Sequence, residues 1–143
     1  MRDIDLIIVH HSASALNTTA KDIAVWHAKR FKLGIGYHRI IEYDGSVLDG
    51  RKIQRTGAHT KGRNTNSVGI CVVGDNTVSG RHWTTVQRDS LELTLLYFAD
   101  LYPAARICGH CDVPGAATLC PGLDIATWCA SRNMPVAVLN RAG

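Results

Sequence analysis

The residues best suited to chemistry gather in the stretch 109–122, which holds His110, Cys111 and Cys120 among several glycines and prolines. Zinc accepts imidazole and thiolate readily, and Gly and Pro fix the backbone angles by which a loop aims such side chains. A catalytic zinc usually has three protein ligands and keeps one position open for water. The stretch can supply two ligands, so we expect a third from elsewhere in the chain.

A second group of candidates lies at the ends of two expected strands. His10 and His11 follow the apolar residues 4–9, which read as a strand buried on both faces, and Tyr37 and His38 open the next strand. Successive strand residues point to opposite faces, so only one of His10 and His11 can face a given site. We expect three strand ends to converge at one edge of the sheet. The alternative for His10 is a hydrogen-bonded, partly buried histidine without a ligand.

The elements that must position these residues follow from periodicity and end signals. Apolar runs, an Asp-Gly hairpin turn at 44–45 and a capping box from Thr84 to Gln87 mark their limits. We expect strands at 4–9, 37–41, 46–49, 67–74 and 106–109, and helices at 20–31, 86–101 and 124–131. This order predicts an α/β fold, with one mixed β-sheet flanked by helices in a single domain over residues 1–143.

Composition narrows the class of protein. The chain has 143 residues, a net charge of +4 and five cysteines, an odd number that makes a disulfide framework a poor interpretation. No apolar run approaches the roughly 18 residues of a membrane helix, and the first residues lack the layout of a signal peptide. We therefore expect a monomeric protein made in the cytosol, with no membrane span and no nucleic-acid partner. The long basic loop at 50–66 is either a solvated charge run or functional.

Four motifs together carry a family resemblance. The motifs are residues 9–13, 36–38 and 66–70 and the stretch 109–122, which begins with Gly-His and ends with Thr-Leu-Cys-Pro-Gly. They span nearly the whole chain and occur in the order found in one known family. The set resembles the zinc-dependent N-acetylmuramoyl-L-alanine amidases, which include the phage amidase lysozymes and the peptidoglycan recognition proteins. The resemblance implies the fold of that family as well as its chemistry.

The resemblance implies a role for each matching residue, and these roles concern zinc, the reacting carbonyl and the substrate groove. The zinc ligands are His10, His110 and Cys120; the catalytic residues are Tyr37 and Thr118; the substrate-binding residues are His59 and Asn66. The implied reaction cuts the amide between N-acetylmuramic acid and L-alanine in peptidoglycan, in the manner of a phage endolysin made in the host cytoplasm that reaches the wall at lysis. A hydrogen-bond partner should also hold each ligand ring.

Two departures from the phage pattern leave alternatives open. The interval from His110 to Cys120 is longer than in phage lysozymes and closer to that of the cytosolic amidases that recycle anhydro-muramyl peptides, and residue 118 is Thr rather than Lys. A non-catalytic peptidoglycan-binding module is the second alternative, although such relatives typically lack the zinc Cys. A third is a structural zinc site built from Cys108, Cys111, His110 and Cys120, and a thioredoxin-like role for the Cys-x-x-Cys pair is a fourth.

Overall fold

One five-stranded sheet organises the chain. The computed structural model describes residues 2–137, and its strands lie in the order β3-β2-β4-β1-β5. The bounds are β1 Leu6–His11, β2 Arg39–Ile41, β3 Val47–Asp49, β4 Ser67–Val72 and β5 Arg106–Gly109. β1 pairs in parallel with β4 and β5, β2 pairs in parallel with β4, and β3 pairs antiparallel with β2 across the hairpin. The expected mixed sheet is confirmed.

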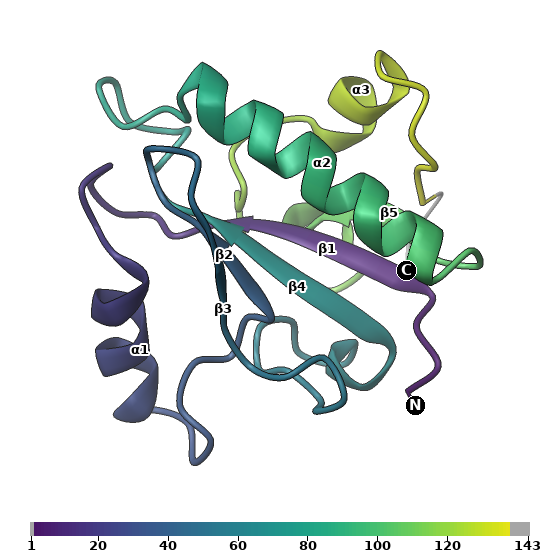
Figure 1. Cartoon of the computed structure of the whole chain (residues 1–143), viewed down its shortest axis with the longest axis horizontal. Helices are drawn as coiled ribbons and strands as arrows, with labels where there is room; N and C mark the ends of the chain where they lie inside the picture. The colour runs from purple at the N-terminus through teal and green to yellow at the C-terminus, as the bar shows by residue number, and fades with distance from the viewer. Residues whose placement is uncertain (1, 138–143) are drawn as a thin grey trace.

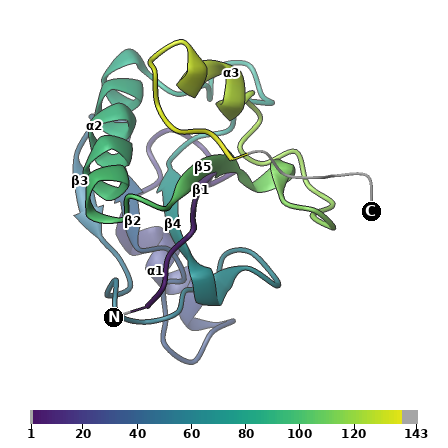
Figure 2. The ribbon, with the colours of Figure 1, turned by 90° about the vertical axis from the view of Figure 1, so that its right-hand side faces the viewer.

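Helices cover both faces of this sheet (Figures 1 and 2). α2 (Thr85–Leu101) and α3 (Ile125–Ala130) pack on one face, while α1 (Ala20–Ala28) lies on the other. The alternation of β4 shows this directly, because Ile70 and Val72 join the α2 core and Cys71 joins the cluster around Ile23 of α1. No helix within residues 2–137 is both long enough and apolar enough to cross a membrane.

The central strands β1 and β4 consist of buried residues throughout. Their register pairs Val9 with Ile70 and continues through His10 opposite Cys71 and His11 opposite Val72. The strand therefore ends at His11, two residues beyond its expected end, because the parallel ladder extends through both histidines. Two polar side chains are thereby held on a rigid, buried strand.

Local end signals set the helix limits. Thr84 accepts a hydrogen bond from the backbone N–H of Gln87, and the Gln87 side chain accepts one from the N–H of Thr84, so the expected capping box is confirmed. α1 ends at Ala28 instead of continuing to residue 31, and the carbonyl of His27 accepts from the N–H groups of both Arg30 and Phe31 in the turn that follows. The single-domain prediction also includes Met1 and residues 138–143, which lie outside the described residues.

We predict that Thr84→Ala lowers the free energy of unfolding by about 1–2 kcal/mol, because the backbone N–H of Gln87 loses its capping acceptor. Thr84 Oγ1 also donates to the carbonyl of Tyr43, which ties α2 to the β2–β3 hairpin. Urea denaturation measures the change. Thr85→Ala, at the adjacent exposed position, is the matched control and should change stability little. Equal effects of the two variants would contradict the capping role.

Candidate active site

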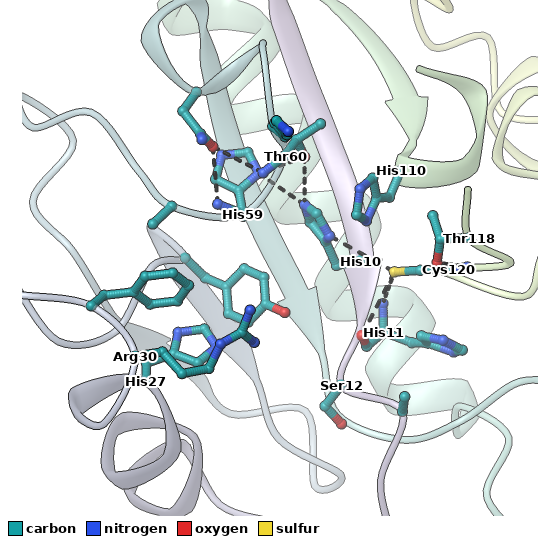
Figure 3. A pocket seen from close by; sticks show the side chains of 16 residues that line it. His10, His11, Ser12, His27, Arg30, His59, Thr60, His110, Thr118 and Cys120 are labelled. Atoms are coloured by element: carbon teal, nitrogen blue, oxygen red, sulfur yellow. Dashed lines mark hydrogen bonds between the residues drawn. The ribbon is translucent and has the colours of Figure 1, made fainter. Parts of the chain in front are cut away.

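A cavity of about 520 Å³ opens on the α1 side of the sheet (Figure 3). Segments far apart in the sequence contribute to its lining: the end of β1, the end of α1, Tyr37, the loop at 58–64 and the loop after β5. β1, which carries His10 at the floor of the cavity, is buried and lies between β4 and β5 in the sheet.

Three potential metal ligands meet at this cavity. The ligand atoms of His10, His110 and Cys120 all lie within 4.8 Å of one another, and the two imidazole centroids are 4.7 Å apart. His10 Nδ1 lies 3.7 Å from Cys120 Sγ. A tetrahedral zinc with ordinary Zn–N and Zn–S bond lengths separates such atoms by about 3.6 Å, so the donor set and its spacing fit zinc. The arrangement can therefore hold a metal ion.

Strand alternation separates His10 from His11, as expected. The His10 ring faces the cavity, whereas the His11 ring points away from it, where its Nδ1 accepts from the N–H of Asn76 at 3.3 Å. The backbone of His11 nevertheless serves the site, because its N–H donates to Cys120 Sγ at 3.3 Å. His11 thus places the Cys120 sulfur beside the His10 ring.

Backbone and side-chain hydrogen bonds hold the loop after β5 in place around Cys120. The N–H of Cys111 donates to the carbonyl of Cys120 at 2.7 Å, and Asn76 Nδ2 donates to the carbonyl of Pro121 at 2.8 Å. Thr118 Oγ1 accepts from the N–H of Cys120 at 3.1 Å. Thr118 lines the cavity as well, so its hydroxyl both orients the ligand Cys and borders the space above it.

Burial keeps the ligand groups neutral. It lowers the pKa of His10 and of His110, so both rings stay unprotonated and their lone pairs are free for a metal. Burial also raises the pKa of the Cys120 thiol to about 12. A thiolate at this position needs a nearby cation, which a divalent metal would supply. Binding of a metal ion would therefore favour the thiolate form of Cys120.

Tyr37 stands beside the ligands. Its ring centroid is 5.1 Å from that of His10, and its side chain lines the cavity. Burial raises the pKa of Tyr37 well above its ordinary value, so its hydroxyl remains a hydrogen-bond donor at neutral pH. Tyr37 precedes β2, however, at the end of the sheet opposite to His10. Of the three strand ends expected to converge, those of β1 and β5 meet at the site, whereas the start of β2 does not, and only the Tyr37 ring reaches the site across the face of the sheet.

The two expected substrate residues lie in different places. His59 lines the cavity, and its Nδ1 lies 2.9 Å from His10 Nε2. Asn66 does not line it: this residue precedes β4 at the far end of the sheet, where its Nδ2 donates to Asp5 Oδ1 at 2.6 Å. Asn64 lines the cavity instead. The sequence favours Asn66 because it opens the motif 66–70, but both asparagines belong to the single 3-10 turn Asn64–Asn66, and only Asn64 lines the cavity.

Sequence reasoning also missed part of the lining. His27 of α1 lines the cavity, and its Nδ1 accepts from the N–H of Gly36 at 2.8 Å. Arg30 and Phe31 join it, because α1 ends early and its last turn opens toward the site. Within the basic loop, Arg51 turns inward and donates to the carbonyls of Gly34, Ile35 and Thr56, so it organises the backbone around the cavity.

The cysteine alternatives do not match the geometry. Cys108 is buried on β5 in a cluster with Leu6, Ile8 and Val113, and neither it nor Cys111 belongs to the ligand group. Across residues 2–137, no second group of His, Cys, Asp or Glu has the spacing needed to hold a metal ion. A structural zinc site on the Cys-x-x-Cys pair therefore has no support in the part of the chain that the structure describes.

Comparisons with known proteins give the class of this fold and site. The family model described as N-acetylmuramoyl-L-alanine amidase matches residues 1–123. The endolysin of Escherichia phage T7 is 36% identical over 129 residues, covering 87% of this chain and 84% of the relative. The amidase LysC from Clostridium intestinale superposes with a TM-score of 0.82 at 30% identity, covering 93% and 87% of the two chains. The Drosophila recognition protein PGRP-SA, with a TM-score of 0.76 at 19% identity and coverage of 98% and 84%, shares the fold.

The chain belongs to the N-acetylmuramoyl-L-alanine amidase family. Within this family it is a peptidoglycan-hydrolysing amidase of the phage type, as the resemblance implied.

We predict that His10→Ala abolishes metal binding and that His11→Ala retains it, because only the His10 ring faces Cys120. Elemental analysis of the purified variants measures bound zinc, and circular dichroism checks that each variant folds. Metal retained by His10→Ala and lost by His11→Ala would show that the strand alternation assigned here is reversed.

Proposed function

We propose that this chain is a zinc-dependent endolysin that cuts the amide between the lactyl group of N-acetylmuramic acid and L-alanine. One observation carries the proposal: two neutral imidazoles and one thiol meet within 4.8 Å at the floor of an open cavity in an amidase-family fold. His10, His110 and Cys120 hold the zinc ion, which when bound activates water and polarises an amide carbonyl. The retained Cys120 favours an enzyme over a binding module.

The residues around the ligands have separate roles in this proposal. Tyr37 keeps its proton and donates a hydrogen bond to the oxygen that becomes negative as the amide carbonyl is attacked. Thr118 holds the backbone N–H of Cys120 and thereby fixes the ligand loop. Its hydroxyl proton remains available to the substrate, but a hydroxyl is a poor general base at its ordinary pKa, so we assign it orientation and not proton abstraction.

The charge of the cavity suits a peptide stem that carries carboxylates. Arg30 and Lys61 line the cavity, and among residues 2–137 no Asp or Glu lines it. A glycosidase needs a pair of carboxyl groups that flank the scissile bond, so the same observation argues against cleavage of the glycan. The stem peptide is therefore the part of the wall that we place over the cavity, with Arg30 and Lys61 near its carboxylates.

The setting in which the enzyme works follows from its relatives. Similar proteins from phages are named endolysins, which supports synthesis in the host cytoplasm and action on the wall at lysis. We propose that the enzyme acts as a monomer, because the described residues complete the site within one chain. An amidase that recycles soluble anhydro-muramyl peptides is the alternative, and the substrate assay below separates the two.

We predict that Tyr37→Phe lowers turnover on the order of 100-fold, the scale of losing one oxyanion donor. Zinc content should stay that of the parent protein, because Tyr37 lies outside the ligand group. Steady-state kinetics and elemental analysis on the same preparation provide both values. Unchanged turnover would remove Tyr37 from the mechanism.

We predict that digestion of purified sacculi releases peptides with a new L-alanine amino terminus and leaves the glycan strands uncut. Mass spectrometry and amino-terminal labelling identify the products. New reducing ends without new amino groups would identify a glycosidase, and binding without either product would identify a recognition module. Activity on soluble anhydro-muramyl peptides alone would favour the recycling alternative. A chelator should abolish cleavage, and added zinc should restore it.

A further inference from the structure

The two ring nitrogens of His10 face in opposite directions. Nδ1 lies toward Cys120 Sγ at 3.7 Å, while Nε2 lies 2.9 Å from His59 Nδ1 and 3.4 Å from Thr60 Oγ1 (Figure 3). A neutral imidazole carries one N–H, and a nitrogen that binds a metal must keep its lone pair free. If Nδ1 is the ligand atom, Nε2 carries the proton and needs an acceptor on the side away from the metal.

His59 supplies that acceptor. Its Nδ1 accepts from His10 Nε2, which places the His59 proton on Nε2, within 3.3 Å of Ser67 Oγ. The three residues thus form a chain of hydrogen bonds, in which His10 donates to His59 and His59 donates to Ser67.

The ring of His59 is held in place by close packing. It meets the His10 ring edge to face, with centroids 4.9 Å apart. A Cβ added at Gly69 of β4 would come within 2.5 Å of the His59 ring, and one at Gly57 within 2.7 Å. Glycine at both positions therefore makes the space that the ring fills. Asn64 Oδ1 accepts from the N–H groups of His59 and Thr60, each at 2.9 Å, and fixes the loop that carries them.

We propose that His59 is a positioning residue that orients the His10 ring for metal binding, in place of the substrate-contact role expected from sequence. Both of its ring nitrogens are engaged inside the protein, so neither is left to bind a peptide. Thr60 Oγ1 lies 3.4 Å from His10 Nε2, where it can accept a weaker hydrogen bond from the same N–H. This inference rests on the proposed zinc site, but it makes a separate claim about what holds one ligand.

Zinc affinity of the metal-free protein tests the proposal, measured by competition with a chromophoric chelator at neutral pH. Loss of a group that orients a metal ligand typically weakens binding about 10-fold to 100-fold, so we expect that loss for His59→Ala. His59→Asn places an amide oxygen near the position of Nδ1 and should recover most of the affinity. His27→Ala removes another cavity-lining histidine, whose Nδ1 accepts from the N–H of Gly36, and it should bind zinc as the parent does.

Two further measurements separate positioning from substrate contact. The visible spectrum of the cobalt-substituted protein should change in His59→Ala, because the geometry around the metal changes, and should return toward the parent spectrum in His59→Asn. At saturating zinc, KM for a soluble muramyl peptide should stay within about twofold of the parent while kcat falls. Parent-like zinc affinity and spectrum together with a raised KM would overturn the proposal and restore the substrate-contact role.

The outcome is independent of the reaction assignment. If the parent protein binds zinc but cuts no wall amide, the proposed function fails, while the affinities of the His59 variants still decide the positioning role. If the parent cuts the amide and His59→Ala binds zinc as tightly as the parent does, only the positioning role fails. Circular dichroism identifies any variant that does not fold. If His59→Ala is one of them, His59→Leu, which fills much of the same space without an acceptor, should show the same loss of zinc affinity, and parent-like affinity of that variant would overturn the positioning role.

Discussion

The site depends on the parallel pairing of β1 with β4 and β5. This ladder keeps β1 straight and buried up to His11, so that alternation sends the His10 ring to the cavity and the His11 ring to the α2 side. A shift of the register by one residue would exchange the two rings and remove the metal site. The core between the sheet and α2 resists such a shift, because Ile7 and Val9 would lose their buried positions.

The second constraint is electrostatic. Three histidines, His10, His59 and His110, lie close together in a cavity without an acidic residue among the described lining. Burial lowers the pKa of each, so the cluster avoids mutual repulsion by staying neutral. The same burial favours the thiol form of Cys120 and keeps the Tyr37 proton in place. A bound divalent cation would favour the thiolate form of Cys120 and supply the positive charge that the proposed hydrolysis of an amide needs.

Much of this arrangement could be predicted from the sequence. Apolar periodicity located the strands and the capped helix α2, and strand alternation separated His10 from His11. These features are local and follow from steric rules. The position of Tyr37 across the sheet face, and that of Asn66 at its far end, could not be predicted, because both depend on how a loop packs. The hydrogen bond from His10 to His59 likewise joins residues 49 positions apart.

X-ray absorption at the zinc edge of the parent protein tests the central claim most directly, because it reports the ligand atoms without any substitution. We expect one zinc per chain, with one sulfur at about 2.3 Å and two imidazole nitrogens at about 2.0–2.1 Å, as for His-His-Cys ligation. A first shell with two or more sulfurs would assign the metal to Cys108 or Cys111 together with Cys120. Such a spectrum, or the absence of bound zinc, would contradict the account.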